Sequence, residues 1–220
     1  MLGQPTIDIF SDPICPWCMI GKRRLDRALG EMRQATPGLA PSIHWRVFQL
    51  NPTMPADGMD RSAYLAAKFG GAERAGEVYR EIRREGLAEG ITFAFDRIRR
   101  TPNTLKAHAL IGLAHGEGGS SEMAERLFQA YFLEGLDIGQ AAVLEGLAAE
   151  VGLAMESVAS CLADDGVSDG LRAEDAAARA RSISGVPFFV IDGRYSLSGA
   201  VAPEVLMRAM ELALAAQAAP

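Results

Sequence analysis

The sequence predicts an α/β protein in which a mixed β-sheet is interrupted by a large all-helical insertion. Three observations support this prediction. Strand, helix and strand patterns follow one another in the first 50 residues, a block of roughly 120 residues then has almost only helical patterns, and an extended hairpin with a helix ends the chain. The two end pieces have the order β-α-β…β-β-α, so the helical block can fold over one side of the sheet.

Side-chain periodicity and the positions of proline predict the first two strands and the helix between them. Residues 6–10 are β-branched and aromatic residues bounded by prolines, which is typical of a strand. Apolar side chains at helical spacing predict a helix from residue 16 to about residue 32, and Pro16 suits its first turn, where an amide would be unpaired. The basic run at residues 22–24 is expected to be a solvated face of this helix. Alternation over residues 42–50 predicts the second strand.

Helical spacing dominates from about residue 62 to residue 181. Asn103 and Thr104 are cap candidates for one of these helices. Strand character returns only at residues 185–199, where an Asp-Gly pair between two extended runs predicts a hairpin. A last helix is predicted from about residue 203 to residue 215. This pattern divides the chain into a sheet domain, residues 1–55 and 183–220, and a helical insertion, residues 56–182.

Composition limits the classes of protein. The chain has 220 residues, of which 49% are hydrophobic and 23% charged, so it can bury a globular core. The net charge of −6 and the lack of a large basic face argue against nucleic acid as a partner. No apolar run approaches the roughly 18 residues needed to cross a bilayer. The N-terminus lacks the basic and apolar regions of a signal peptide. We therefore expect a cytoplasmic protein with no membrane partner.

Two of the three cysteines, Cys15 and Cys18, lie at the junction of the first predicted strand and helix. A thiol in the first helical turn faces unpaired backbone N–H groups and the positive end of the helix dipole, and both favour the thiolate that attacks disulfides. Cys15 is expected to be this exposed thiol. Cys18 lies one turn further on and is expected to be more buried, but close enough to resolve a mixed disulfide.

Two alternatives compete with a redox pair. A structural zinc site needs four ligands, and the other candidates form no second close pair, so no metal site is predicted. These candidates are Cys161, His44, His108 and His115. The second alternative is that both cysteines are buried and inert. Cys161 itself lies in an apolar helical stripe and is expected to pack in the core.

A second signal is Pro187, which begins the predicted hairpin although proline donates no ladder hydrogen bond. A cis Val186–Pro187 peptide bond would explain this position, but alone the signal is weak. Together with the C-P-W-C motif, it makes the chain resemble the thioredoxin fold. The long helical insertion makes it similar to DsbA-like proteins. It resembles in particular the FrnE-like or 2-hydroxychromene-2-carboxylate isomerase-like branch, which includes kappa-class glutathione transferases.

The segments that carry this resemblance are spread along nearly the whole chain in the family's order. They are SDPICPWCMIGK (11–22), VFQLNPTMPADG (47–58), TPNTLKAHAL (101–110), LFQAYFLEGLDIG (127–139) and SGVPFFVIDGRYSLSGA (184–200). Two positions depart from the family. Val201 stands where the family often has Gln, and Met19, expected at the rim of the cleft, stands where it often has Tyr.

The resemblance implies a role for each site residue. Cys15 would be the nucleophile and Cys18 the resolving thiol. A cis-proline would face Cys15, and the backbone before it would pair an extended substrate or glutathione like an added strand. The substrate-binding residues implied are Pro16, Trp17, Val186, Pro187, Asn103 and His108. The last two would line the helical side of the cleft, and the alternative for His108 is a polar residue on an apolar helix face.

Two functions remain open. The first is a thiol-disulfide oxidoreductase that acts on protein or small-molecule disulfides. The second is a glutathione-dependent isomerase or transferase, but members of the branch that work this way typically have serine at the first motif position and no C-x-x-C. Both cysteines are present here, which favours redox chemistry. No bound cofactor is expected beyond the redox-active Cys15–Cys18 disulfide, glutathione is a candidate co-substrate, and the protein is expected to be a monomer or a homodimer.

Overall fold

The computed structural model describes residues 4–218 and contains a four-stranded mixed sheet. Its strands are β1 (Thr6–Ser11), β2 (Ser42–Val47), β5 (Phe188–Ile191) and β6 (Tyr195–Ser198), in the spatial order β2-β1-β5-β6. β1 is parallel to β2 and antiparallel to β5, and β6 is antiparallel to β5. This is the predicted thioredoxin fold, in which the first strand lies inside the sheet.

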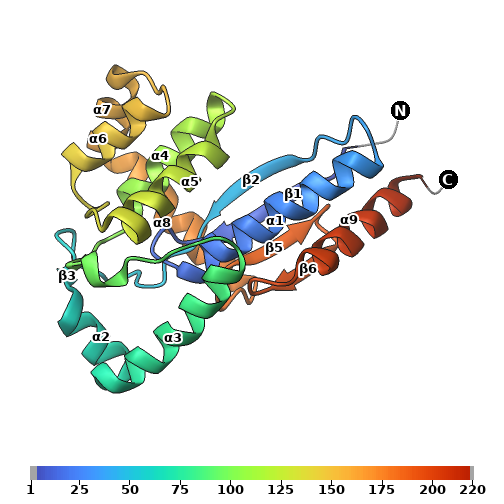
Figure 1. The fold of residues 1–220 in the computed structure, drawn as a ribbon. Helices are drawn as coiled ribbons and strands as arrows, with labels where there is room; N and C mark the ends of the chain where they lie inside the picture. Colours follow the sequence, from blue (N-terminus) through green and yellow to red (C-terminus); the bar gives the residue numbers. More distant parts are fainter. Residues whose placement is uncertain (1–3, 219–220) are drawn as a thin grey trace.

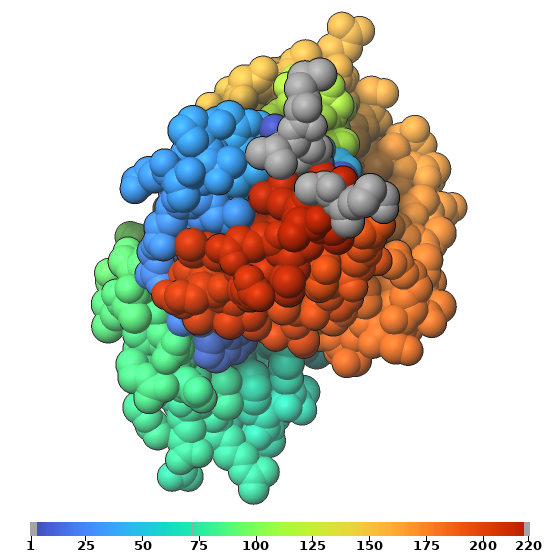
Figure 2. Space-filling model, turned by 90° about the vertical axis from the view of Figure 1, so that its right-hand side faces the viewer, coloured from blue at the N-terminus to red at the C-terminus, as the bar shows by residue number. Residues whose placement is uncertain are grey.

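Helices cover the sheet and build the insertion. They are α1 (Pro16–Ala35), α2 (Arg61–Phe69), α3 (Ala72–Ala88), α4 (Leu105–Gly116), α5 (Ser120–Gln129), α6 (Ala141–Glu150), α7 (Met155–Ala163), α8 (Asp165–Ala180) and α9 (Pro203–Ala218). Figure 1 shows α1 and α9 side by side along one face of the sheet, while α4–α8 gather beyond the strands and α2 and α3 form a separate arm. In Figure 2, α9 (red) lies open across the side of the molecule that faces the viewer.

The alternation of β1 divides the core between the two faces of the sheet. Ile7 and Ile9 are buried against α1 and α9, in a cluster that also contains Leu25 and Met210. Phe10 points the other way, into a smaller cluster next to α8. Each fully buried Ile or Leu contributes about 1.5–3 kcal/mol through burial, so the cluster under α1 fixes the helix that carries both site cysteines.

The predicted hairpin is confirmed between β5 and β6. Asp192 and Gly193 have φ of 52° and 65°. Tight hairpin turns need positive φ at their central residues, which Asp-Gly provides at low cost. The Asp192 carboxylate also accepts a hydrogen bond of 2.8 Å from the backbone N–H of Thr6 and so ties the turn to β1.

The second strand ends earlier than predicted, at Val47 rather than at residue 50. The reason is that buried carboxylates replace the ladder. The backbone N–H of Gln49 donates to Asp175 at 2.8 Å, and that of Leu50 donates to Asp12 at 2.6 Å. Both carboxylates come from distant parts of the chain, so local alternation could not reveal them.

The helical block also contains a short ladder that the sequence analysis does not predict. β3 (Met59–Asp60) pairs with β4 (Arg100–Thr101) in an antiparallel two-stranded sheet. Strands of two residues are too short to show a period. The block further includes a 3-10 turn (Phe95–Arg97) and a π-helical turn (Ala130–Glu134) that continues α5.

The prediction that residues 22–24 form a solvated face is wrong. The side chain of Arg24 is only 14% exposed and pairs with Glu89, the residue that follows α3, at 2.8 Å. Arg23 pairs with Glu125 of α5 at 2.5 Å. The basic run therefore joins α1 to the helical insertion on two sides. Within the described part of the chain, no helix combines the length and the apolarity needed to span a bilayer.

Candidate active site

Cys15 lies at the junction between β1 and α1. It is the N-cap of α1, with φ −92° and ψ 111°, and Pro16 is the first helical residue. The backbone N–H of Cys15 donates to the carbonyl of Asp12 at 2.9 Å, and its thiol lies 3.5 Å from the carbonyl oxygen of Val186. The side chain is 4% exposed, so the expectation of an exposed thiol in the first turn is wrong. The hairpin segment that contributes Val186 lies against this sulfur.

Cys18 lies one helical turn further in and is 2% exposed. Burial raises the pKa of the Cys18 thiol well above its ordinary value, and the adjacent Cys15 side chain raises it further. All three cysteines of the chain are free thiols in this structure. Cys18 therefore stays protonated at neutral pH.

The Val186–Pro187 peptide bond is cis and lies beside Cys15, as the family resemblance implies. Helix α1 approaches this loop closely because residue 21 is glycine. A Cβ atom at Gly21 would lie 3.0 Å from Cγ of Pro187 and 3.3 Å from Cζ of Phe189. The absent side chain thus allows the helix with the two thiols and the loop with the proline to meet.

Asp12 is a buried carboxylate next to the thiols, and it was not among the predicted site residues. It is 1% exposed and accepts hydrogen bonds from the backbone N–H of Ile14 (3.2 Å) and of Leu50 (2.6 Å). Burial raises its pKa to about 6. Asp12 therefore connects the cysteine loop to the segment after β2. Its place between Ser11 and Pro13 gave no sign of burial.

Asn103 and His108 are joined to the cysteine loop through the segment after β2. Of the two predicted cap candidates, Thr104 is the N-cap of α4. The Oδ1 of Asn103, one residue before it, accepts from the Leu105 N–H at 3.0 Å, and its Nδ2 donates to the Met54 carbonyl at 2.7 Å. His108 is 3% exposed, and its ring lies near the backbone of Phe48. Burial lowers the pKa of His108 to about 4, so the ring is neutral at pH 7. Its Nε2 is buried and has no hydrogen-bond partner among the described residues.

The residues beside the cysteines have different environments. Pro16 and Trp17 are half-buried, and Trp17 packs on the apolar cluster that contains both cysteines. Met19 is fully buried in that cluster, so its predicted place at the cleft rim is wrong. Val201 is half-buried and packs against the cluster under α1 and α9.

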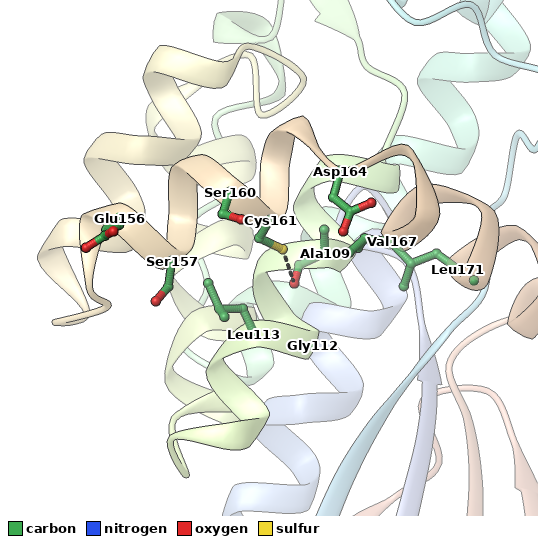
Figure 3. Close-up of a pocket in the computed structure, with 11 residues that line it drawn as sticks. Ala109, Gly112, Leu113, Glu156, Ser157, Ser160, Cys161, Asp164, Val167 and Leu171 are labelled. Atoms are coloured by element: carbon green, nitrogen blue, oxygen red, sulfur yellow. Dashed lines mark hydrogen bonds between the residues drawn. The ribbon is translucent and has the colours of Figure 1, made fainter.

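The prediction that Cys161 packs in the core is wrong. It is half-buried and lines a groove of about 770 Å³ between α4, α7 and α8 (Figure 3). Its thiol donates to the carbonyl of Ala109 at 3.7 Å, and burial raises its pKa. Within residues 4–218, no group of three His, Cys, Asp or Glu side chains is arranged to hold a metal ion.

Comparisons with known proteins agree with the fold. A family model described as a DSBA-like thioredoxin domain matches residues 6–211. The chain is similar to the probable DsbA oxidoreductase SCO1869 from Streptomyces coelicolor, with 30% identity, a TM-score of 0.84, and coverage of 96% of this chain and 91% of that one.

Two more distant structures share the fold. One is 2-hydroxychromene-2-carboxylate isomerase, with 15% identity, a TM-score of 0.70, and coverage of 97% of this chain and 98% of that one. The other is the cytosolic disulfide reductase DsbM from Pseudomonas aeruginosa with GSH, with 20% identity, a TM-score of 0.60 and coverage of 96% of both chains.

Proposed function

Because the chain belongs to the DSBA-like thioredoxin domain family, we propose that it is a thiol-disulfide oxidoreductase that uses Cys15 and Cys18. One observation carries the proposal: two free thiols lie at the start of α1 in unequal environments, and the outer one contacts the Val186 carbonyl at 3.5 Å. The likeness to the isomerase shows a shared fold alone. An isomerase that activates glutathione would not require a second thiol one turn into the helix.

The proposed reaction is a pair of thiol-disulfide exchanges. The Cys15 thiolate attacks one sulfur of the substrate disulfide, the substrate S–S bond breaks, and one substrate thiolate leaves. Cys18 then loses its proton and attacks the Cys15 sulfur, which releases the second substrate thiolate. Two electrons pass from the protein to the substrate, and the protein ends with a Cys15–Cys18 disulfide. The reverse sequence oxidises a dithiol substrate.

The residues around the thiols have proposed roles in binding. The Val186 backbone would pair an extended substrate beside Pro187 like an added strand. Pro16 and Trp17, half-buried beside the thiols, would contact the substrate directly. Asn103 would hold the loop at Met54 in place through its 2.7 Å hydrogen bond.

Glutathione is the candidate co-substrate, and a reducing cytoplasm is the proposed location. Both proposals are supported by the likeness to DsbM, a cytosolic disulfide reductase whose structure is with GSH. His108 would keep the segment after β2 in place as a neutral ring, because its Phe48 contact lies at the end of that strand.

A trapping experiment tests the assignment of the two thiols. The Cys18→Ser variant should accumulate a stable mixed disulfide with glutathione, visible by intact-mass spectrometry, because the resolving thiol is gone. Cys15→Ser should accumulate almost none, and Cys161→Ser should match the wild type. An adduct on Cys15→Ser at the same level, or glutathione-dependent isomerase activity retained by that variant, would refute the proposed chemistry.

A further inference from the structure

Ser11 is the polar residue that ends an apolar row of β1. The alternation of a strand places it on the same face as Ile7 and Ile9, which pack against α1. The residue is 3% exposed, and its hydroxyl oxygen is buried and has no hydrogen-bond partner among the described residues. An unpaired buried hydroxyl is costly, and a role in catalysis is one physical explanation for keeping it.

Ser11 faces the first turn of α1, which carries Cys18. Because β1 and β2 are parallel, α1, which connects them, runs back along β1 (Figure 1). The end of the strand therefore lies beneath the start of the helix. Ile9 and Leu25 share one buried cluster, which agrees with this direction. Ser11 lies two residues beyond Ile9 toward that end. Cys18 lies about two helical turns before Leu25 toward the same end.

The charge that forms on Cys18 during the reaction arises in a site that water does not reach. Cys18 is 2% exposed, so its sulfur is not solvated. Burial raises the pKa of the thiol most, and the Cys15 side chain raises it further, whereas the Ser11 hydroxyl and the Asp12 N–H, which lie near the sulfur, act in the opposite direction. Once Cys15 is in a mixed disulfide it carries no charge, and burial remains as the obstacle to ionisation.

The hydroxyl of Ser11 suits the thiolate of Cys18 rather than the thiol. A thiol sulfur is a weak acceptor, which agrees with the unpaired hydroxyl in the reduced protein. A thiolate is an ionised acceptor, and hydrogen bonds to ionised groups are roughly twice as strong as those between neutral groups. The unpaired donor is thus in place before the charge appears, so little reorganisation is needed when the charge forms.

We infer that Ser11 is a catalytic residue of the resolving step, whose hydroxyl donates a hydrogen bond to the Cys18 thiolate. The inference rests on the proposed function and adds a residue to it. Cys18 loses its proton, its sulfur forms a bond with the Cys15 sulfur, and the bond between Cys15 and the substrate sulfur breaks. The proton that Cys18 loses is balanced by the one that the leaving substrate thiolate takes up, and Ser11 keeps its own. In the reverse reaction the same hydroxyl stabilises Cys18 as the leaving thiolate.

The test separates the two exchange steps by stopped-flow absorbance. A small amount of dithiobis(nitrobenzoate), an aromatic disulfide whose thiolate product is coloured, is mixed with an excess of the reduced protein. All proteins carry Cys161→Ser, so that only the dithiol reacts. Attack by Cys15 releases the first coloured thiolate at a rate proportional to the protein concentration. Attack by Cys18 on the Cys15 sulfur releases the second at a rate independent of that concentration, so this second phase measures the resolving step.

We expect Ser11→Ala to slow the second phase about tenfold at pH 7 and to leave the first phase unchanged. A tenfold change corresponds to about 1.4 kcal/mol, at the lower end of the range for a hydrogen bond to a charged group. The lower end applies because the thiolate that has lost the hydrogen bond is more basic and therefore a better nucleophile. Ser11→Thr keeps the hydroxyl and suits a strand, so its second phase should stay within about threefold of the parent protein.

Two further measurements exclude a merely structural role for Ser11. The midpoint of urea unfolding of reduced Ser11→Ala should equal or exceed that of the parent, because the hydroxyl forms no hydrogen bond in the dithiol form. The ratio of oxidised to reduced protein in a glutathione buffer should not change, because Cys18 is a protonated thiol in the reduced form and a disulfide sulfur in the oxidised form. The matched control is Ser120→Ala, which removes another buried serine hydroxyl, at the start of α5, and should leave both phases unchanged.

The outcomes separate the two proposals. If the parent protein releases no coloured thiolate, or only the first, the proposed function itself fails. If both phases appear but Ser11→Ala resolves as fast as the parent, the role of Ser11 is refuted and the oxidoreductase stands. A second phase as slow in Ser11→Thr as in Ser11→Ala, or an equal slowing in Ser120→Ala, would also refute it. A lower unfolding midpoint or a shifted glutathione ratio for Ser11→Ala would have the same meaning.

Discussion

Replacing Asp12 with Asn should change how the stability of the protein depends on pH. The reason is that the contributions of Asp12 and His108 to stability change with pH in opposite directions. Burial raises the pKa of Asp12 from 3.8 to about 6 and lowers that of His108 from 6.5 to about 4. The stability that Asp12 contributes is complete below pH 3.8 and is lost as the pH rises through 6. The stability that His108 contributes is complete above pH 6.5 and is lost as the pH falls through 4.

The size of each effect follows from the two pKa differences. A difference of one in pKa corresponds to about 1.4 kcal/mol. The change from 3.8 to about 6 in Asp12 and the change from 6.5 to about 4 in His108 therefore each amount to about 3 kcal/mol of unfolding free energy. Both side chains are almost fully buried, so solvent does not screen these effects. In the wild type the two contributions nearly cancel between about pH 4 and 6.5.

Urea unfolding at pH 4, 5, 6 and 7, followed by circular dichroism, measures the effect. Asp12→Asn leaves only His108, so its unfolding free energy should rise by about 3 kcal/mol from pH 4 to pH 7 relative to the wild type. His108→Gln leaves only Asp12, so its free energy should fall by about 3 kcal/mol relative to the wild type. Other titrating groups affect all curves alike and drop out of the differences. A curve for Asp12→Asn that runs parallel to the wild type would refute the burial of an ionised carboxylate beside the thiols.

The remaining predictions concern glycine positions and the third thiol. Gly21→Ala should lower the unfolding free energy by about 1–3 kcal/mol in urea and slow adduct formation at the active site, because its Cβ would lie 3.0 Å from the Pro187 ring. Gly30→Ala, on the same helix with open space around it, should instead stabilise by about 0.5–1 kcal/mol; equal effects of the two would contradict the close packing. Gly58→Ala should destabilise by more than about 1 kcal/mol, since Gly58 has φ +72° and its Cβ would lie 2.6 Å from a backbone carbonyl; a wild-type melting temperature would argue against this. Cys161→Ser should leave disulfide exchange unchanged, and a slower rate would show that its groove acts on the dithiol.

Elements with a local signal were predictable from the sequence. The hairpin follows from Asp192-Gly193, because the turn depends on backbone freedom that these two residues have by themselves. The first strand and helix follow from side-chain period and from Pro16. The prediction that the cis-proline lies beside Cys15 came from the family resemblance, since no local pattern in the sequence indicates a contact between residues so far apart.

Features set by distant partners were not predictable. β2 ends early because the Asp175 carboxylate accepts the N–H of Gln49, and these residues are 126 positions apart. The side chain of Arg24 is mostly covered because Glu89, which directly follows α3, pairs with it. Cys15 is covered because the hairpin segment reaches it. A helical period shows which residues share a face, but not which partner covers that face.

The place of β1 in the middle of the sheet has a consequence for biosynthesis. Cys15 and Val186 are 171 positions apart, and β1 has β5 as its neighbour on the side away from β2. A ribosome that has translated the chain through α8 has made a central strand with one open edge, and a thiol without the segment that covers it. Open strand edges and uncovered apolar surface are what make nascent chains prone to wrong pairing. Cys15 and Cys18 are therefore both synthesised early in translation, but they become shielded only when the final strands have been made.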